Sequence, residues 1–307
     1  MEPIKISVII PTINAAACLE ELIGRIKNQR QQAGQIIVID SGSSDGTLEL
    51  ATELGATVIA ITPGTFDHGA TRNLAAEEAS GSIIVFMTQD ALPADDETIG
   101  RLIEPLKEDL TVVSYARQVP ADEASFSEKY LRLANYPPQS LLKDKSSIAE
   151  LGIKAFQNSN VCAAYRRHEF EKLGRFPAPV VCNEDMLFAA KAIFQDYRVS
   201  YCAGAVVEHT HDLTIKDFFR RYFDIAASLH HEPRIKSLGR AEAKGFAFFK
   251  NQVKYIADQH RQHELPRVIC ETAAKYLGYK CGALHTIFPG KLKKYLGLNS
   301  AYWRKME

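Results

Sequence analysis

Apolar residues near the start of the chain fall in short β-branched runs that alternate with stretches of helical spacing. The runs predict strands at residues 6–10, 35–40, 57–61 and 83–87. The stretches between them predict helices at residues 18–26, 48–54 and 71–79. Because few polar residues interrupt the runs, we expect these strands to be buried on both faces, as in a parallel sheet covered by helices. The pattern therefore indicates an α/β fold built from βαβ units.

The second half of the chain carries a weaker pattern. It predicts helices at residues 97–107 and 183–194, and strands at residues 111–116, 156–165 and 198–207. Beyond residue 215, helices rich in aromatic and basic residues replace the β-branched runs. We therefore expect an α/β domain over residues 1–215 and a C-terminal helical region over residues 216–307.

Composition and charge narrow the class of protein. The 307 residues are 46% hydrophobic and 24% charged, which is ordinary for a globular protein. The formal net charge is zero, which argues against a nucleic-acid-binding protein, because such proteins usually carry a basic excess. The six cysteines form no C-x-x-C pair, and we expect neither a signal peptide nor an apolar stretch of about 18 residues that spans a membrane. These features predict a cytoplasmic protein.

Polar residues gather where three of the predicted strands end. They occupy residues 11–14, 40–47 and 88–90. In a parallel sheet the carboxyl ends of the strands meet at one edge, where ligands bind. The small residues Ser41, Gly42 and Ser43 let a ligand approach the backbone at a helix start, which suits phosphate, while Asp40 and Asp45 offer acceptors for a ribose or base. A tight turn that caps the next helix explains the same loop equally well.

Two other interpretations compete at this loop and at the next strand end. The spacing Gly42-x-Ser44-x-Gly46 matches a hydrolase nucleophile elbow, but it follows only the second strand and lacks upstream oxyanion-loop glycines, so we do not favour a hydrolase. Asp90 follows the fourth strand, where a carboxylate suits Mg²⁺ or Mn²⁺ together with substrate phosphate. The alternative is an ordinary aspartate that ends a strand.

Three further segments carry chemistry-bearing side chains. Arg72, in a polar segment over residues 66–73, has the geometry to pair with a diphosphate, although it can equally be a surface arginine. Glu184 and Asp185 begin a helix, where acidic residues are favoured in any case, but a carboxylate there can also act as a general base. His209 and His211 point to the same side of an extended strand, so one of them is a candidate metal ligand.

Taken in order, these segments resemble the family 2 glycosyltransferases of the GT-A fold over roughly residues 4–225. The resemblance rests on residues 7–14, 38–47, 88–90 and 183–185, and residues 66–73, 88–91, 209–211 and 220–224 are closer still to bacterial rhamnosyltransferases. It implies a nucleoside-diphosphate sugar donor, a divalent metal and inversion at the anomeric carbon. The predicted nucleotide-sugar site comprises Pro11, Thr12, Asn14, Asp40, Ser41, Gly42, Ser43, Asp45, Arg72, Asn73, Gln89 and Asp90.

The resemblance also assigns the chemistry. Asp185 matches the family's catalytic base, with Glu184 as its neighbour in the catalytic pair. Asp90 matches the last carboxylate of the D-x-D metal motif, and His209 matches the histidine that completes a Mg²⁺ or Mn²⁺ site, with His211 as a further candidate. One departure is that Thr88 replaces the first aspartate of the motif, which lowers the expected metal affinity. The rhamnosyltransferase branch often shows the same replacement.

We therefore predict an inverting glycosyltransferase that moves L-rhamnose from dTDP-rhamnose to a hydroxyl of a glycan or lipid-linked glycan, as in cell-surface polysaccharide synthesis. A UDP-sugar donor and a non-catalytic nucleotide-sugar-binding scaffold are the alternatives. The basic and aromatic residues of the segment 286–307 fit either a solvated chain end or a peripheral contact with anionic lipid at the inner face of the plasma membrane. The oligomeric state is left open by the sequence.

Overall fold

The computed structural model describes residues 4–211, 213–238 and 241–306, except for the side chains of residues 236, 237, 241–244 and 246. The chain separates into two compact units. The first comprises Met1–Ala121, Tyr136–Val180 and Glu184–Thr210, and the second comprises Asp122–Asn135, Val181–Asn183 and His211–Glu307. These ranges differ from the two domains predicted from the sequence, since two short earlier segments group with the C-terminal helices. The predicted domain boundary at residue 215 stays a prediction.

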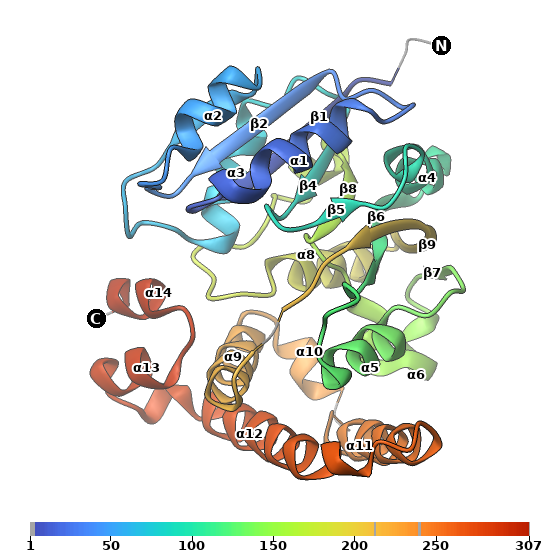
Figure 1. Ribbon diagram of the computed structural model, residues 1–307, viewed down its shortest axis with the longest axis vertical. Helices are drawn as coiled ribbons and strands as arrows, with labels where there is room; N and C mark the ends of the chain where they lie inside the picture. Colours follow the sequence, from blue (N-terminus) through green and yellow to red (C-terminus); the bar gives the residue numbers. More distant parts are fainter. Residues whose placement is uncertain (1–3, 212, 239–240, 307) are drawn as a thin grey trace. The chain divides into compact units, whose positions relative to one another are not determined.

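The first unit is built on one mixed β-sheet (Figure 1). Its strands lie in the order β3-β2-β1-β4-β8-β6-β9-β5, with β7 paired to β9. The strands in the described residues are β1 Ile6–Thr12, β2 Gln35–Asp40, β3 Thr57–Ala60, β4 Ile83–Met87, β5 Leu92–Pro93, β6 Thr111–Val119, β7 Leu141–Lys143, β8 Cys162–Arg166 and β9 Arg198–Glu208. Strands β1 to β4 are parallel, as the sequence predicts, whereas β8 runs antiparallel to both β4 and β6.

Helices cover both faces of this sheet. In the first unit they are α1 Ala16–Lys27, α2 Thr47–Glu53, α3 His68–Glu77, α4 Thr98–Ile103, η1 Glu104–Lys107, α6 Ser147–Leu151, η2 Gly152–Phe156, α7 Arg167–Lys172 and α8 Glu184–Phe194. The prediction of a strand over residues 156–165 was wrong for its first part, because β8 begins only at Cys162. Before it, the side chains of Asn158 and Asn160 form hydrogen bonds in a loop.

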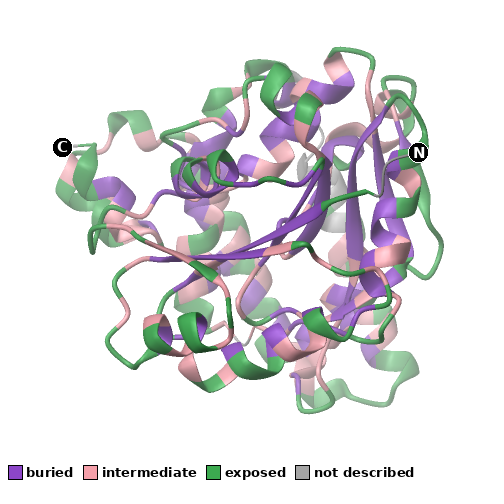
Figure 2. Cartoon of the chain, turned by 90° about the horizontal axis from the view of Figure 1, so that it is seen from above, coloured by how far each residue is buried: buried purple, intermediate pink, exposed green. Residues whose placement is uncertain are grey.

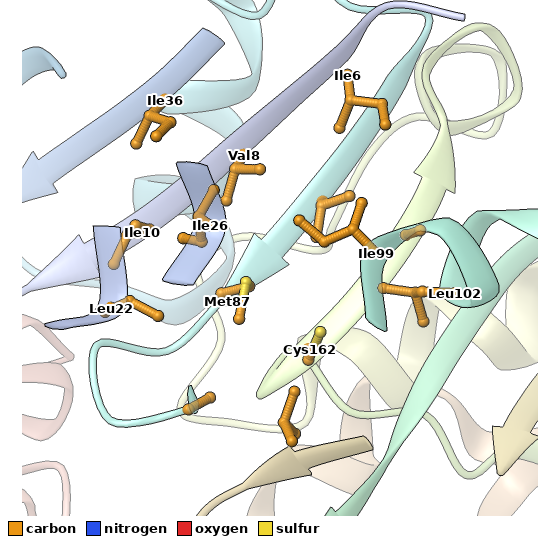
Figure 3. Packing of buried hydrophobic residues seen from close by; sticks show 14 of the residues in the cluster. Ile6, Val8, Ile10, Leu22, Ile26, Ile36, Met87, Ile99, Leu102 and Cys162 are labelled. Atoms are coloured by element: carbon orange, nitrogen blue, oxygen red, sulfur yellow. The ribbon is translucent and has the colours of Figure 1, made fainter. Parts of the chain in front are cut away.

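The core of the first unit lies on the two faces of the sheet. Ile6, Val8 and Ile10 of β1 pack on one face against Leu22 and Ile26 of α1, and α4 contributes to the same cluster (Figure 3). On the other face a group of rings contact one another: Phe86, Tyr165, Phe170, Phe176 and Phe188. Since both faces are covered, the strands are buried while the flanking helices expose their outer surfaces (Figure 2). This explains the uninterrupted apolar runs in the sequence.

The second unit is helical in its described part. Its helices are α5 Phe126–Asn135, α9 Ile215–Ser228, η3 Leu229–His231, α10 Pro233–Ser237, α11 Ala241–Asp258, η4 Gln262–Glu264, α12 Leu265–Ala283, η5 His285–Ile287, α13 Gly290–Leu296 and α14 Ser300–Lys305. Helices α9 and α12 pack closely because α12 has glycines at the contact. An added Cβ on Gly278 or Gly282 would lie 2.2 or 2.1 Å from the carbonyl oxygen of Phe219 or Phe223, respectively.

A buried carboxylate joins the last helix to α9 within the second unit. Asp224 accepts hydrogen bonds from the backbone N–H of Leu298 and Asn299 and from Nε1 of Trp303, at 2.9, 2.8 and 2.8 Å. Burial raises the pKa of Asp224 to about 6. No helix in the described ranges is long and apolar enough to cross a membrane.

Candidate active site

Three loops meet at the carboxyl ends of β1, β2 and β4. The Asn14 side chain accepts a hydrogen bond from the Ser44 backbone at 3.0 Å, and the Asn14 N–H donates to Ser43 Oγ at 2.7 Å. Gln89 holds the same segment from the other side, because its amide accepts from Ile13 N at 2.8 Å and donates to Ile13 O at 3.2 Å. The three loops therefore form one hydrogen-bonded edge, and the parallel pairing of β1 with β2 and β4 explains why their carboxyl ends lie together.

The predicted nucleotide residues differ in how far a ligand can reach them. Asp40 and Thr12 are buried, and the Asp40 carboxylate accepts from Thr12 Oγ1 at 2.9 Å and from the N–H groups of Gly42 and Ser43 at 2.9 and 2.8 Å. Burial alone would raise the pKa of Asp40, but the bonds from Ser43, Gly42 and Thr12 lower it below its ordinary value. Asp40 is therefore a carboxylate at neutral pH, and its hydrogen bonds hold the loop that follows β2.

The other members of this predicted set keep exposed surface. Asn14, Gly42, Asp45 and Asp90 are exposed, and Pro11, Ser41, Ser43 and Gln89 are half-buried. Gly42 has a φ of 101°, and an added Cβ would lie 2.6 Å from Pro63, so only glycine fits there. Asp45 accepts from Ala16 N at 3.0 Å, and its bonds to Thr47 lower its pKa. The exposed groups are the ones that a nucleotide can contact.

The start of α3 holds the loop that leads towards α8. Asp67 caps α3 by accepting from the N–H groups of Gly69 and Ala70, and its second oxygen accepts from Val180 N at 2.9 Å. Asn73 exchanges two hydrogen bonds with the backbone of Phe176, at 2.9 and 3.1 Å. The polar segment over residues 66–73 therefore fixes residues 176–180, which three residues separate from the predicted catalytic pair, and Asn73 is used in this contact.

Arg72 and Glu184 form a buried ion pair. Their closest atoms, Nη1 and Oε1, are 3.3 Å apart, and only 5% and 4% of the two side chains are exposed. Glu184 also accepts from Nδ2 of Asn160 at 3.0 Å and lies 3.9 Å from His68 Nδ1. Burial acts to raise the pKa of Glu184, but Arg72, His68 and the Asn160 amide outweigh it and lower the pKa. Glu184 is thus held as a carboxylate.

Asp185 differs from its neighbour because no cation contacts it in the described structure. Its two oxygens accept from Asn160 N at 2.9 Å and from Met186 N at 2.7 Å. Burial and the negative charge of Glu184 raise the pKa of the Asp185 carboxyl to about 7. Two adjacent carboxyl groups with pKa values moved in opposite directions are typical of an acid–base site, because a base works best when its pKa is close to the working pH.

The sequence interpretation missed the residues that hold this pair. Tyr165, in the ring cluster of the core, donates its hydroxyl to Asn160 Oδ1 at 2.7 Å and accepts from Asn158 Nδ2 at 2.7 Å. Asn158 also donates to the backbone oxygen of Asp185 at 3.3 Å. The two asparagines fall in the segment that was predicted as a strand, and their interruption of the apolar run was the available signal.

Sheet pairing also brings Asp90 to His209. Strand β5, which follows Asp90, runs antiparallel to the end of β9, which precedes His209. His209 Nε2 lies 3.4 Å from Asp90 Oδ1, and His209 itself is buried. Thr88 N donates to Val161 O at 3.1 Å, so the turn that carries Asp90 lies beside the loop that carries Asn160. The candidate metal residues and the predicted base therefore share one edge of the sheet.

Gln118 sets the orientation of the His209 ring. Its Nε2 donates to the hydroxyls of Tyr136 and Ser159 at 2.7 and 2.8 Å, so its oxygen faces His209 Nδ1, at 3.2 Å. If Nδ1 carries the ring proton and donates it to this oxygen, the lone pair of Nε2 is available to a metal ion beside the Asp90 carboxylate. Two cis ligands of an octahedral Mg²⁺ or Mn²⁺ lie about 3 Å apart, so these two donors fit such an ion.

His211, the second candidate histidine, belongs to the other compact unit. It follows His209 by two residues, and its backbone N–H donates to Glu128 at 3.4 Å within that unit. Its part in metal binding stays a prediction from the sequence.

Comparison with known proteins identifies the family. A sequence model of glycosyl transferase family 2 matches residues 7–174. The O-antigen chain rhamnosyltransferase RfbN of Salmonella typhimurium is 38% identical over 306 residues, which cover 99% of this chain and 97% of that protein. The O-antigen chain rhamnosyltransferase WbaN of Salmonella anatum is 35% identical over 304 residues, which cover 98% of this chain and 96% of that protein.

Solved structures share the fold. The mannosyltransferase PcManGT from Pyrobaculum calidifontis, in complex with GDP-Man and Mn²⁺, aligns with a TM-score of 0.58 at 20% identity and covers 98% of this chain and 85% of its own. S. aureus TarS 1-349 in complex with UDP-GlcNAc aligns with a TM-score of 0.55 at 16% identity, covering 92% and 91%. The family match and the mixed sheet with its flanking helices agree, and the chain therefore belongs to glycosyl transferase family 2, as a glycosyltransferase of GT-A fold.

Proposed function

We propose that this glycosyltransferase transfers L-rhamnose from dTDP-rhamnose to a hydroxyl group of a glycan, with inversion at the anomeric carbon. The observation that carries the proposal is the near full-length similarity to two O-antigen chain rhamnosyltransferases, at 38% and 35% identity. That similarity spans the second unit as well as the sheet. It therefore supports a shared class of acceptor as well as a shared donor sugar.

Asp185 is the proposed general base. Its carboxylate takes the proton of the acceptor hydroxyl as the hydroxyl oxygen forms a bond to the anomeric carbon. The bond from that carbon to the diphosphate oxygen breaks, and the nucleoside diphosphate leaves with the electron pair. The N–H groups of Asn160 and Met186 orient the carboxylate, and a pKa near neutrality suits both uptake and later release of the proton.

Arg72 and Glu184 are proposed to position Asp185. The sequence interpretation gave Arg72 to the donor diphosphate, but a buried guanidinium paired with Glu184 favours a role in holding the catalytic helix. Glu184 connects that pair to Asn160, which in turn contacts Asp185. The charge of Glu184 also keeps the pKa of the base high. Arg72 therefore acts through Glu184, away from the reacting atoms.

Asp90 and His209 are the proposed ligands of a Mg²⁺ or Mn²⁺ ion, with Gln118 orienting the histidine. When bound, such an ion neutralises charge on the departing diphosphate. The exposed part of the loop edge, Asn14, Gly42 and Asp45, is proposed to contact the nucleotide. Support comes from the 3.4 Å separation of the two metal donors and from the exposure of the loop residues.

The experiment is a pair of isosteric variants, Asp185→Asn and Glu184→Gln, assayed for transfer from dTDP-rhamnose and for donor binding by thermal shift with Mn²⁺. Asp185→Asn should lose at least about 100-fold in turnover, the scale of general-base catalysis, while donor binding stays unchanged. Near-normal turnover of Asp185→Asn would show that the base is wrongly assigned. Stabilisation of the native enzyme by a UDP-sugar and none by dTDP-rhamnose would reject the donor and leave the family intact.

A lipid-linked glycan is the proposed acceptor. Support comes from the two relatives, whose names place them in O-antigen chain synthesis. Such an acceptor would require the enzyme to work beside a membrane, although no described helix can span one. Transfer to an acceptor in vesicles, compared with transfer to its free glycan, tests this part of the proposal: equal rates would speak against a lipid-linked acceptor.

A further inference from the structure

The C-terminal part of the chain is strongly biased in charge. From Thr272 to Met306 there is no aspartate or glutamate, whereas this stretch contains seven basic residues: Lys275, Lys280, Lys291, Lys293, Lys294, Arg304 and Lys305. The whole chain, by contrast, has 37 basic and 37 acidic residues. All the described residues of this stretch lie in the second unit, over α12, η5, α13 and α14 (Figure 1). The second unit therefore carries a local positive charge that the rest of the chain balances.

The same stretch exposes large apolar side chains. Ile269, Tyr276 and Leu277 of α12, together with Leu284 at its C-terminal cap, follow the spacing of one helical face, and each is more than half exposed. The opposite face of α12, with Val268, Glu271, Ala274, Gly278 and Gly282, is buried. Ile287 in η5 is 71% exposed, and Tyr295 in α13 is 64% exposed. Exposed apolar residues concentrated in this way indicate an interaction surface, since scattered ones would not follow a helix face.

Basic and apolar side chains are interleaved in this stretch. Lys280 lies on the exposed face of α12, with its Nζ 5.6 Å from the centre of the Tyr276 ring. Lys291 and Lys294 are exposed on α13 beside Tyr295 in the sequence. We call these residues the C-terminal basic surface: Tyr276, Leu277, Lys280, Leu284, Ile287, Lys291, Lys294 and Tyr295. Aliphatic and tyrosine side chains among lysines match the boundary of an anionic bilayer, where hydrocarbon lies just below negative headgroups.

We propose that the C-terminal basic surface binds the enzyme peripherally to a bilayer of anionic lipid. A second copy of this chain fits the surface less well, because a symmetric dimer contact would bring like charges together. A nucleic acid matches the lysines but leaves the exposed Leu277, Leu284 and Ile287 without apolar partners. This inference builds on the proposed lipid-linked acceptor by naming the surface that meets the membrane, and its assay needs no sugar donor.

The test is flotation of the full-length chain with vesicles of phosphatidylcholine, with and without about one-third phosphatidylglycerol. The native chain should bind the anionic vesicles only. Lys291→Glu with Lys294→Glu should lower the partition coefficient at least about 30-fold. Loss of two lysines at about 1 kcal/mol each corresponds to that factor, and the two added glutamates are repelled by the anionic headgroups as well. Leu284→Gln with Ile287→Gln leaves the charge unchanged and should lower it at least about tenfold.

The matched control is Lys250→Glu with Lys254→Glu, which makes the same charge change on exposed residues of α11 in the same unit. It should lower binding by no more than about threefold at 0.15 M salt, because both lysines lie on α11, outside the C-terminal basic surface, and salt screens charges that do not contact the headgroups. Equal losses in the two charge variants would overturn the proposal, as would absence of native binding or concentration-dependent dimers that the Leu284→Gln/Ile287→Gln variant abolishes. Circular dichroism confirms that each variant is folded.

Discussion

The buried pair of Arg72 and Glu184 yields the sharpest stability prediction. The Arg72→Met variant removes the guanidinium 3.3 Å from Oε1 of Glu184 and leaves a carboxylate whose side chain is only 4% exposed, next to Asn160 and to His68, whose side chain is 34% exposed. Loss of one partner of a buried pair costs about 3–5 kcal/mol, because the remaining charge is neither hydrated nor paired. At roughly 2 °C for each kcal/mol in a chain of this size, the melting temperature should fall by about 6–10 °C.

The double variant Arg72→Met/Glu184→Gln separates the two possible roles of Arg72. If the arginine mainly pairs with Glu184, removal of both charges should restore more than half of the lost stability, since a neutral replacement of a buried pair is often tolerated. Urea unfolding gives the free energies for all four members of the cycle, and calorimetry with dTDP and Mn²⁺ gives nucleotide affinity in parallel.

The opposite outcome is equally clear. Suppose that the free energy of unfolding of Arg72→Met is within about 1 kcal/mol of the native value, and that the single variant and the double variant both lose nucleotide affinity at least tenfold. Arg72 then binds the donor diphosphate. That result would refute the positioning role and restore the role expected from the sequence.

Three more predictions follow from the same structure. Glu184→Gln removes a negative charge that raises the pKa of Asp185. The acidic limb of the pH profile of kcat/KM, measured between pH 5 and 9, should therefore move to lower pH by about one to two units. An unmoved limb would contradict the effect of the Glu184 charge on Asp185. Gln118→Leu should weaken Mn²⁺ binding about 10–100-fold in calorimetry while His209 is retained, and unchanged affinity would show that the amide does not orient the ring. Asp224→Ala should shift the emission of the chain's single tryptophan to the red, because it removes the carboxylate that holds Leu298, Asn299 and Trp303, and water that reaches the indole moves its emission to longer wavelength. In the native chain the folded pKa of Asp224, about 6, lies above its unfolded value. The stability that this group contributes is therefore complete below about pH 4 and is lost as the pH rises through 6, so native stability should fall over that range.

Much of the first unit was predictable because its signals are local. The strand runs of β1 to β4 and the polar residues that end them follow directly from buried parallel pairing, which demands apolar residues on both faces. The family and GT-A fold were also predicted correctly, since the order of the short segments is itself diagnostic.

The antiparallel insertion of β8 was less predictable. Its five residues read as the end of a longer strand, and nothing in their own pattern states which neighbours they pair with. Strand β5, with two residues, is too short to produce a periodic signal at all, yet its pairing with β9 is what brings Asp90 to His209. Such pairings depend on partners far away in the sequence.

The sequence by itself determined which residue types stand at the ends of the strands and at the start of α8, and hence the class of chemistry: carboxylates, a histidine and a nucleotide loop. Only the tertiary structure decided how the pKa values of the two adjacent carboxyl groups, Glu184 and Asp185, move in opposite directions. Arg72, 112 positions before Glu184, holds that residue as an anion. Asn160 contacts Asp185 and is itself bound by Tyr165, which belongs to the ring cluster of the core. Burial and the distance to an opposite charge set a pKa, and both are properties of packing that adjacent letters in a chain do not contain.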